Sequence, residues 1–188
     1  MGGVPRVTLD ACVLFPSVLR AILLRLARAG LYEPVWSDRI LEEWRRAVMR
    51  LGPDALAEAD ADAARMREVF PRALTPARPD LEARHVLPDA NDLHVLASAI
   101  ASGSDALLTY NAADFPGHVL AAEGLARRDP DGFLWELWSR APDAVREAIT
   151  ATHADAERLA GHPVSLKALL KRNRLNRLAR ALDAPGRA

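Results

Sequence analysis

The sequence predicts an α/β fold, in which a central parallel sheet is covered by helices on both faces and followed by a helical extension. Short apolar runs of strand length alternate with segments of helical periodicity up to about residue 128, and only helical periodicity follows. Such alternation is typical of parallel strands joined by helical crossovers. We therefore expect an α/β/α domain over residues 1–128 and a helical C-terminal extension over residues 129–188.

The first strand is predicted at residues 7–10, Val-Thr-Leu-Asp, where a β-branched and apolar run ends on a carboxylate. In open parallel sheets, ligands bind outside the carboxyl ends of the strands, so Asp10 lies at the expected functional edge. A turn or helix-capping role would explain an Asp there equally well. The choice depends on whether further carboxylates reach the same edge.

A helical stripe over residues 14–29 stops at Gly30, and a second strand is expected over residues 31–36. Pro34 lacks a backbone N–H, which favours an edge position for this strand. Ser37 can then cap the next helix, because its hydroxyl accepts a hydrogen bond from the first helical turn.

Two adjacent glutamates in this helix differ in their expected surroundings. Glu42 falls on a charged face, where arginines at helical spacing can pair with it in water. Glu43 falls within the apolar stripe formed by Ile40, Trp44 and Ala47. A buried carboxylate is costly without a partner, so Glu43 indicates a metal or a cationic partner. A slightly rotated helix would instead bring Glu43 to water.

A further helix is expected to begin near Asp89 and to end at Gly103. Asp89 lies at its N-cap and Asp92 at its third helical position, and a capping pair would explain both residues. We interpret Asp89 as the cap and Asp92 as a second candidate at the sheet edge. His94 is expected on a different face, at the surface or behind the ligands.

The strand predicted at residues 106–109 is followed by a polar segment. Thr109, Asn111 and Asp114 thus arrive at the edge where Asp10 lies, although turn chemistry alone would explain each of them. A short strand near residues 125–127 completes the predicted sheet.

The C-terminal extension carries a basic tail. Residues 164–188 hold seven Lys and Arg residues against one Asp, a balance of +6, and the whole chain has a formal net charge of +0. A last helix is expected from Ser165 through Leu182. Lys167, Lys171 and Arg174 would either contact RNA phosphates or form the solvated face of an amphipathic helix packed on the acidic body. The acidic body slightly favours the second interpretation.

Composition narrows the class of protein. A zero net charge argues against a generally cationic nucleic-acid binder. Cys12 is the single cysteine, so no internal disulfide can form and a reducing cytoplasm is expected. No apolar stretch approaches the length of about 20 residues that a membrane span requires, and no membrane association is expected.

The predicted sheet edge gathers four carboxylates, which belong to Asp10, Glu43, Asp92 and Asp114. Like charges repel unless a cation lies between them, and hard oxygen ligands favour Mg²⁺ or Mn²⁺. The histidines are scattered and give no zinc spacing. An acidic site with such an ion suits phosphodiester hydrolysis, in which Thr109 and Asn111 can orient a water or a phosphate oxygen.

Four segments carry a family resemblance: Val7–Asp10, Ile40–Trp44, Asp92–Ala99 and Leu108–Phe115. In order and spacing they resemble the motifs of PIN-domain ribonucleases, in particular the VapC-type toxins of bacterial type II toxin–antitoxin pairs. The stretch that begins at Asp131 is similar to the helical C-terminal extension of some PIN proteins.

The resemblance implies Mg²⁺- or Mn²⁺-dependent endonucleolytic cleavage of RNA, a homodimer, and inhibition by a cognate antitoxin. By position, Asp10 and Asp92 become the main metal ligands and Glu43 the third acidic member. The fourth acid corresponds either to Asn111 or to Asp114. Cys12 departs from the pattern, because the family often has Asn or Ser there.

Two other classes compete with the nuclease. Phosphatases with an Asp-x-Asp nucleophile also begin from a strand-end Asp, but Cys12 occupies the second Asp position here. A PIN scaffold that binds RNA or a protein partner without cutting would need no charge on an apolar helix face, so Glu43 argues against it.

Overall fold

The computed structural model describes residues 3–183. Its centre is a four-stranded sheet in the order β2-β1-β3-β4, and all neighbouring strands are parallel. The strands are β1 (Arg6–Leu9), β2 (Glu33–Val35), β3 (Ala106–Leu108) and β4 (Ala126–Arg128). The parallel sheet confirms the predicted α/β class.

The sheet places two polar residues side by side at its carboxyl edge. The Asp10 N–H donates to the Leu108 carbonyl at 3.1 Å, and the Thr109 N–H donates to the Arg128 carbonyl at 3.1 Å. Each residue therefore extends the backbone ladder one step past its strand. The prediction that Pro34 marks an edge strand is also confirmed, because β2 pairs with β1 alone among the named strands of the described chain.

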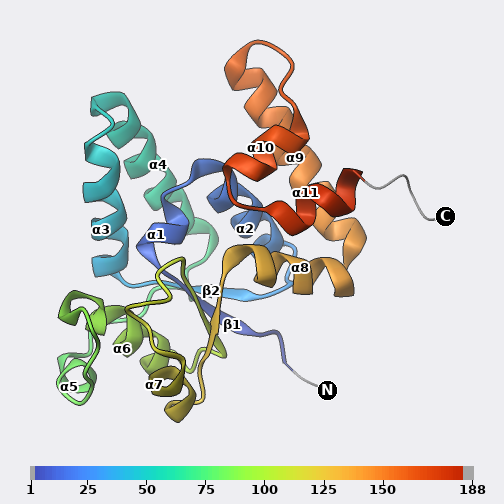
Figure 1. Cartoon of the computed structure of the whole chain (residues 1–188). Coiled ribbons are helices and arrows are strands. Elements are labelled where there is room, and N and C mark those ends of the chain that lie inside the picture. The colour runs from blue at the N-terminus through green and yellow to red at the C-terminus, as the bar shows by residue number, and fades with distance from the viewer. Residues whose placement is uncertain (1–2, 184–188) are drawn as a thin grey trace.

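Helices flank the sheet on both sides, with α6 and α7 on one side and α2 and α8 on the other (Figure 1). The helices of the domain are α1 (Ala11–Leu14), α2 (Ser17–Arg28), α3 (Asp38–Met49), α4 (Pro53–Val69), α5 (Pro79–Glu82), α6 (Leu93–Ala101) and α7 (Gly117–Ala122). Those of the extension are α8 (Pro130–Arg140), α9 (Pro142–Ala160), α10 (Leu166–Arg172) and α11 (Asn176–Asp183).

Local sequence explains several helix boundaries. The helix expected over residues 14–29 is present as α2, but it begins at Ser17, because Pro16 lies at its N-cap and separates it from α1. Ser37 caps α3 as predicted, since its hydroxyl accepts from the Ile40 N–H at 3.3 Å. A 3-10 turn, Ala90–Asp92, precedes α6, and Asp89 caps that turn.

The expected last helix over residues 165–182 is wrong. The chain turns between α10 and α11, and Arg174 adopts a left-handed backbone with φ 59°. Leu170, Leu175 and Leu178 are all buried, and the turn lets α11 pack on both α10 and α8. Arg187, which was counted in the basic tail, lies outside the described residues.

One hydrophobic core runs through the domain and the extension. It includes Leu9 and Leu108 from the sheet and Leu134 and Ile149 from the extension. Helix α9 packs on α2, and the rings of Tyr32 and Phe133 meet edge to face at 5.2 Å. Strand β4 ends at the predicted boundary, residue 128. The extension that follows packs on the domain and shares its hydrophobic core. Within residues 3–183, every helix is too short or too polar to cross a bilayer.

Candidate metal centre

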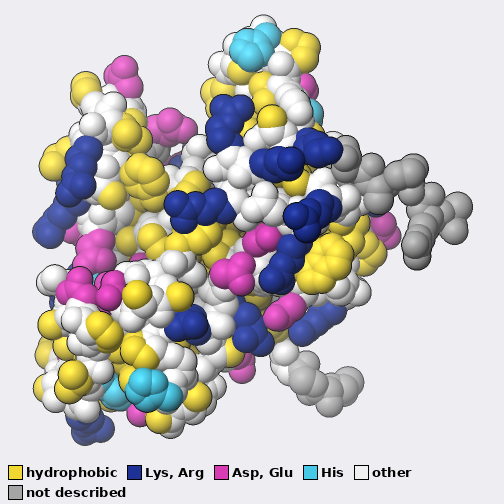
Figure 2. All heavy atoms as spheres, viewed as in Figure 1, with side chains coloured by type: hydrophobic (Ala, Val, Ile, Leu, Met, Phe, Trp, Pro, Cys, Tyr) yellow, Lys and Arg dark blue, Asp and Glu magenta, His cyan; other side chains and the backbone are white. Residues whose placement is uncertain are grey.

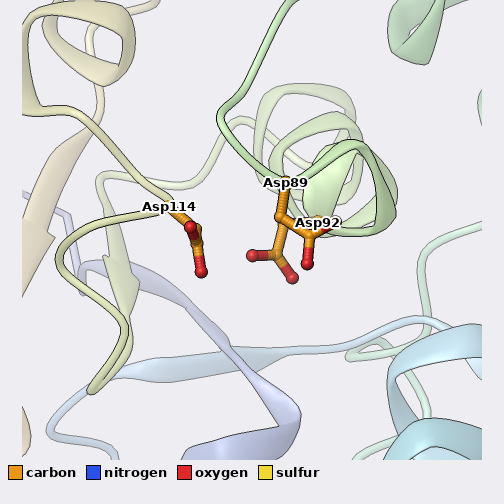
Figure 3. Close-up of side chains that lie close together, drawn as sticks. All are labelled: Asp89, Asp92 and Asp114. Atoms are coloured by element: carbon orange, nitrogen blue, oxygen red, sulfur yellow. The ribbon is translucent and has the colours of Figure 1, made fainter.

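Three carboxylates meet near the carboxyl edge of the sheet. Asp89, Asp92 and Asp114 can each offer an oxygen such that the three atoms lie within 4.8 Å of one another. Asp89 and Asp92 come from the turn that opens α6, and Asp114 comes from the loop after β3 (Figure 3). Asp92 and Asp114 were both predicted to reach this edge.

Asp89 caps a helix, as predicted, and also belongs to the acidic cluster, although the sequence analysis interpreted it only as the cap. Its carboxylate accepts from the Asn91 N–H at 2.9 Å, which is the predicted capping role. The same side chain faces Asp92 and Asp114. Because residues three apart in a tight turn lie on one side, the spacing of Asp89 and Asp92 was the signal that could have placed both at the centre.

Asp10 lies beside this trio in a buried, hydrogen-bonded position. It is 7% exposed, and its Oδ2 accepts from the Thr109 hydroxyl at 2.6 Å and from the Cys12 thiol at 3.1 Å. Burial, and next the charge of Asp10, raise the pKa of Cys12 to about 12, so the sulfur keeps its proton. The thiol thus acts as a hydrogen-bond donor at the position where the family often has Asn or Ser.

Asn111 connects Asp10 to the trio. Its backbone N–H donates to the Thr109 hydroxyl oxygen at 2.9 Å, and Thr109 in turn donates to Asp10. The Asn111 side-chain amide donates to Asp92 Oδ2 at 3.4 Å and also to Asp114. A hydrogen-bonded path therefore joins Asp10 through Thr109 and Asn111 to Asp92 and Asp114. Glu43, which was also predicted for this edge, lies outside this path.

The centre carries more negative charge than its own donors balance. Burial, and then the charges of Asp10, Asp89, Asp114 and Glu43, raise the pKa of Asp92 to about 6. Four carboxylates therefore act on Asp92, as expected for an acid placed among others at one edge.

Glu43 has ion-pair partners within the protein. Its Oε1 lies 2.8 Å from His94 Nε2 and 3.8 Å from Arg39 Nε, and its side chain is 32% exposed. The expectation of a surface His94 is wrong, because its side chain is only 4% exposed, while a place behind the acids fits. Glu42 instead pairs with Arg46 at 3.0 Å on the charged face, as predicted. The buried cation-capable partner of Glu43 is therefore a histidine that lies across from it on α6.

The residues present fit a hard divalent cation. The centre offers carboxylate oxygens, which Mg²⁺ and Mn²⁺ prefer. Burial first, and then the neighbouring carboxylates, raise the pKa of Asp92, and a bound cation would offset both effects. Asp89, Asp92 and Asp114 would hold it most directly, and Asp10 lies next to them at the same edge.

The three basic residues considered for RNA contact take different positions. Lys167 and Lys171 are exposed on α10. Arg174 instead points back to the domain, where its guanidinium lies over the ring of Tyr110 at 5.1 Å. Tyr110 directly follows Thr109, so Arg174 reaches the neighbourhood of the acidic residues.

The sheet and the acids at its carboxyl edge describe a parallel α/β domain with a candidate site for a cation. Residues 6–113 match the PIN domain, which is more than half of the chain, and the chain belongs to the PIN domain family. PIN domains are generally metal-dependent nucleases. Comparisons with curated proteins and with solved structures found no match.

Proposed function

We propose that this PIN-domain protein is an endoribonuclease that hydrolyses RNA phosphodiester bonds with Mg²⁺ or Mn²⁺. One observation carries the proposal: Asp10, Thr109 and Asn111 form a hydrogen-bonded path to Asp92 and Asp114 at the carboxyl edge of the sheet. Acids far apart in the sequence are thereby held around one space.

Each side chain has a role in this chemistry. A bound ion would lower the pKa of a water and neutralise charge on the phosphate. Asp92, Asp114 and Asp89 would hold the ion, with Asp10 beside them. Thr109 fixes the orientation of Asp10, and the Asn111 amide fixes Asp92 and Asp114 and can orient a phosphate oxygen. Glu43 and His94 form a pair at the side of the centre, where Glu43 acts on Asp92 through its charge.

The proposal extends to biological role. The resemblance of the four motifs to VapC-type toxins supports a toxin of a toxin–antitoxin pair, with RNA as substrate and an antitoxin protein as partner. The same resemblance supports a homodimer, and the single cysteine, Cys12, supports a reducing cytoplasmic location. Growth inhibition on expression, relieved by loss of the acids, is the expected cellular consequence.

Substitution of the central acids tests the activity. Asp10→Asn and Asp92→Asn remove negative charge from the centre at nearly constant shape, and each should lower the rate of RNA cleavage at least about a hundredfold. Cleavage of labelled RNA is measured with Mn²⁺ and with EDTA, and growth is followed on expression.

Glu42→Gln is the matched control, because Glu42 lies next to Glu43 but pairs with Arg46 in solvent. It should cut RNA and inhibit growth as the unchanged protein does. Equal activity of all three variants would refute the assignment. RNA binding without cleavage by the unchanged protein in Mn²⁺ would instead support a PIN scaffold that does not cut.

A further inference from the structure

A groove lies between the domain and the C-terminal extension. It is formed by α1, the end of α3, Tyr110 and the turn between α10 and α11, and its volume is about 720 Å³. Figure 2 shows this side of the molecule hollowed between α3 and α10, with hydrophobic side chains at its floor and basic side chains over α10 and α11. Sites of roughly 300–1,000 Å³ hold ligands of drug size, so the groove has room for a nucleotide-sized segment.

The side chains of the groove are basic and aromatic. Of the described residues that line it, none is acidic, and the charged ones are Arg50, Arg172 and Arg174. Phe15 and Tyr110 add two aromatic rings. Arginine guanidinium planes and aromatic rings are the groups on which unpaired RNA bases stack, and arginines also bind phosphates.

Arg174 holds an unfavourable backbone conformation. Its φ of 59° lies in the left-handed region, and no other non-glycine residue of the described chain has a positive φ. A glycine would adopt this turn without steric cost, whereas other residues lose about 1–2 kcal/mol. The side chain of Arg174 lies over Tyr110 inside the groove. The left-handed turn that ends α10 thereby brings the Arg174 side chain over Tyr110.

Two residues of the groove wall are directly connected to Asp10. Cys12 lines the groove and donates to Asp10, and the Tyr110 N–H donates to the Cys12 sulfur at 3.3 Å. Tyr110 also follows Thr109, which donates to the same carboxylate. The wall of the groove and the acidic centre are therefore neighbours, joined through Cys12 and the Thr109–Tyr110 peptide.

We propose that this groove, termed the extension groove, binds single-stranded RNA next to the cleavage centre. Arg174 and Tyr110 form a platform on which an unpaired base stacks, and Arg50 and Arg172 contact phosphates. The C-terminal extension thereby supplies half of a substrate site that the PIN domain alone does not complete. The inference rests on RNA as the substrate of the proposed function.

Binding without metal tests the extension groove separately from cleavage. The full chain is titrated in EDTA with a labelled single-stranded RNA of 12 nucleotides, at about five salt concentrations, and with the same sequence as a duplex. Arg174→Gly should weaken single-strand binding about tenfold, as expected for the loss of one stacked base. Because glycine accepts the left-handed turn, this variant should melt at or above the temperature of the unchanged protein.

Arg50→Ala and Arg172→Ala should each reduce the slope of log affinity against log salt by about 0.7, the value for one lost phosphate contact on a single strand. Lys171→Ala is the matched control, since it removes the same charge from α10 outside the groove lining. Lys171→Ala should change the affinity for single-stranded RNA less than about twofold.

Three results would overturn the inference: full affinity in Arg174→Gly, an equal loss in Lys171→Ala, or tighter binding of the duplex than of the single strand. Unchanged RNA affinity in all groove variants would leave the groove to a protein partner instead. None of these results depends on cleavage, so the groove can fail while the nuclease proposal holds. Absence of metal-dependent cleavage with intact groove binding would reject the nuclease proposal alone.

Discussion

The metal centre and the extension groove are neighbours with opposite charge and different construction. The centre is built from acids that follow β1 and β3 or open α6, and a path of hydrogen bonds from Asp10 to Asp114 holds them. The groove is built from arginines at the end of α3 and at the α10–α11 turn, which lie far apart in the sequence. Carboxylates bind a cation, whereas arginines bind phosphate. The centre is therefore built for the cleavage chemistry and the groove for binding the substrate.

A substitution that destabilises the extension should therefore weaken RNA binding by the groove and leave metal binding by the centre intact. Leu178 is fully buried on α11, and α11 packs on α8. Leu178→Ala should lower the free energy of unfolding by about 2–5 kcal/mol, the usual cost of a leucine-to-alanine cavity. Urea unfolding measures the loss. At temperatures where the variant stays folded, single-strand RNA affinity should fall while the Mn²⁺-induced rise in melting temperature persists.

The surface residue Leu159 on α9 provides the control for this comparison, since it is 83% exposed. Leu159→Ala should change the unfolding free energy by less than about 0.5 kcal/mol. A Leu178→Ala protein that loses its response to Mn²⁺ as well would show that the two regions are one cooperative unit.

Metal binding should depend on pH through the centre alone. Mn²⁺ at a hundred times its dissociation constant should stabilise the native state by about 2.7 kcal/mol at pH 7.5. Because the pKa of Asp92 is raised to about 6, protons compete with the ion in mildly acidic solution. At pH 5 the apparent affinity should be about tenfold weaker than at pH 7.5.

Melting curves at several Mn²⁺ concentrations and both pH values measure this dependence. Arg172→Ala, which lies in the groove, should show the same two curves as the unchanged protein. A melting temperature that does not respond to millimolar Mn²⁺ at pH 7.5 would argue against the metal centre.

The smallest expected effect is that of Asp92→Asn on the stability of the metal-free protein. The folded-state pKa of Asp92 is raised from its ordinary value of 3.8 to about 6, mainly by burial. Its protonated form favours folding, so this contribution is full below pH 3.8 and is lost as the pH rises through about 6. Asp92→Asn should then raise the unfolding free energy by about 1 kcal/mol at pH 8, a value reduced for partial solvent exposure.

The advantage of Asp92→Asn should disappear near pH 4, where the native Asp92 is itself protonated. Urea unfolding in EDTA at both pH values gives the comparison. A variant less stable than the unchanged protein at pH 8 would mean that Asp92 is stabilised as an anion, contrary to its place among like charges.

Local sequence determined most of the sheet and of its acidic edge. The apolar runs that end at Asp10 and Thr109 are strands, and Pro34 lies on an edge strand, because buried strands and missing N–H groups leave clear patterns. Strand ends of a parallel sheet meet at one edge, so Asp10, Thr109, Asn111 and Asp114 could be brought together before any coordinates were known.

Side-chain partners could not be predicted in the same way. Periodicity placed Glu43 on the apolar face of its helix but could not show that His94 lies 2.8 Å from it. Likewise, capping rules explained Asp89 and so concealed that its carboxylate also faces Asp92 and Asp114. Each of these contacts depends on how two elements pack, which one helical pattern does not contain.

By itself, the sequence determined which polar residue follows each apolar strand, and hence the edge of the sheet at which the acids collect. Only the tertiary structure decided that the basic tail folds back at Arg174 and forms a groove against α1 and α3. The reason is physical. Strand ends are aligned by the repeating hydrogen bonds of the sheet, whereas the docking of a broken helix depends on the burial of Leu170, Leu175 and Leu178 in a core shared by the whole chain.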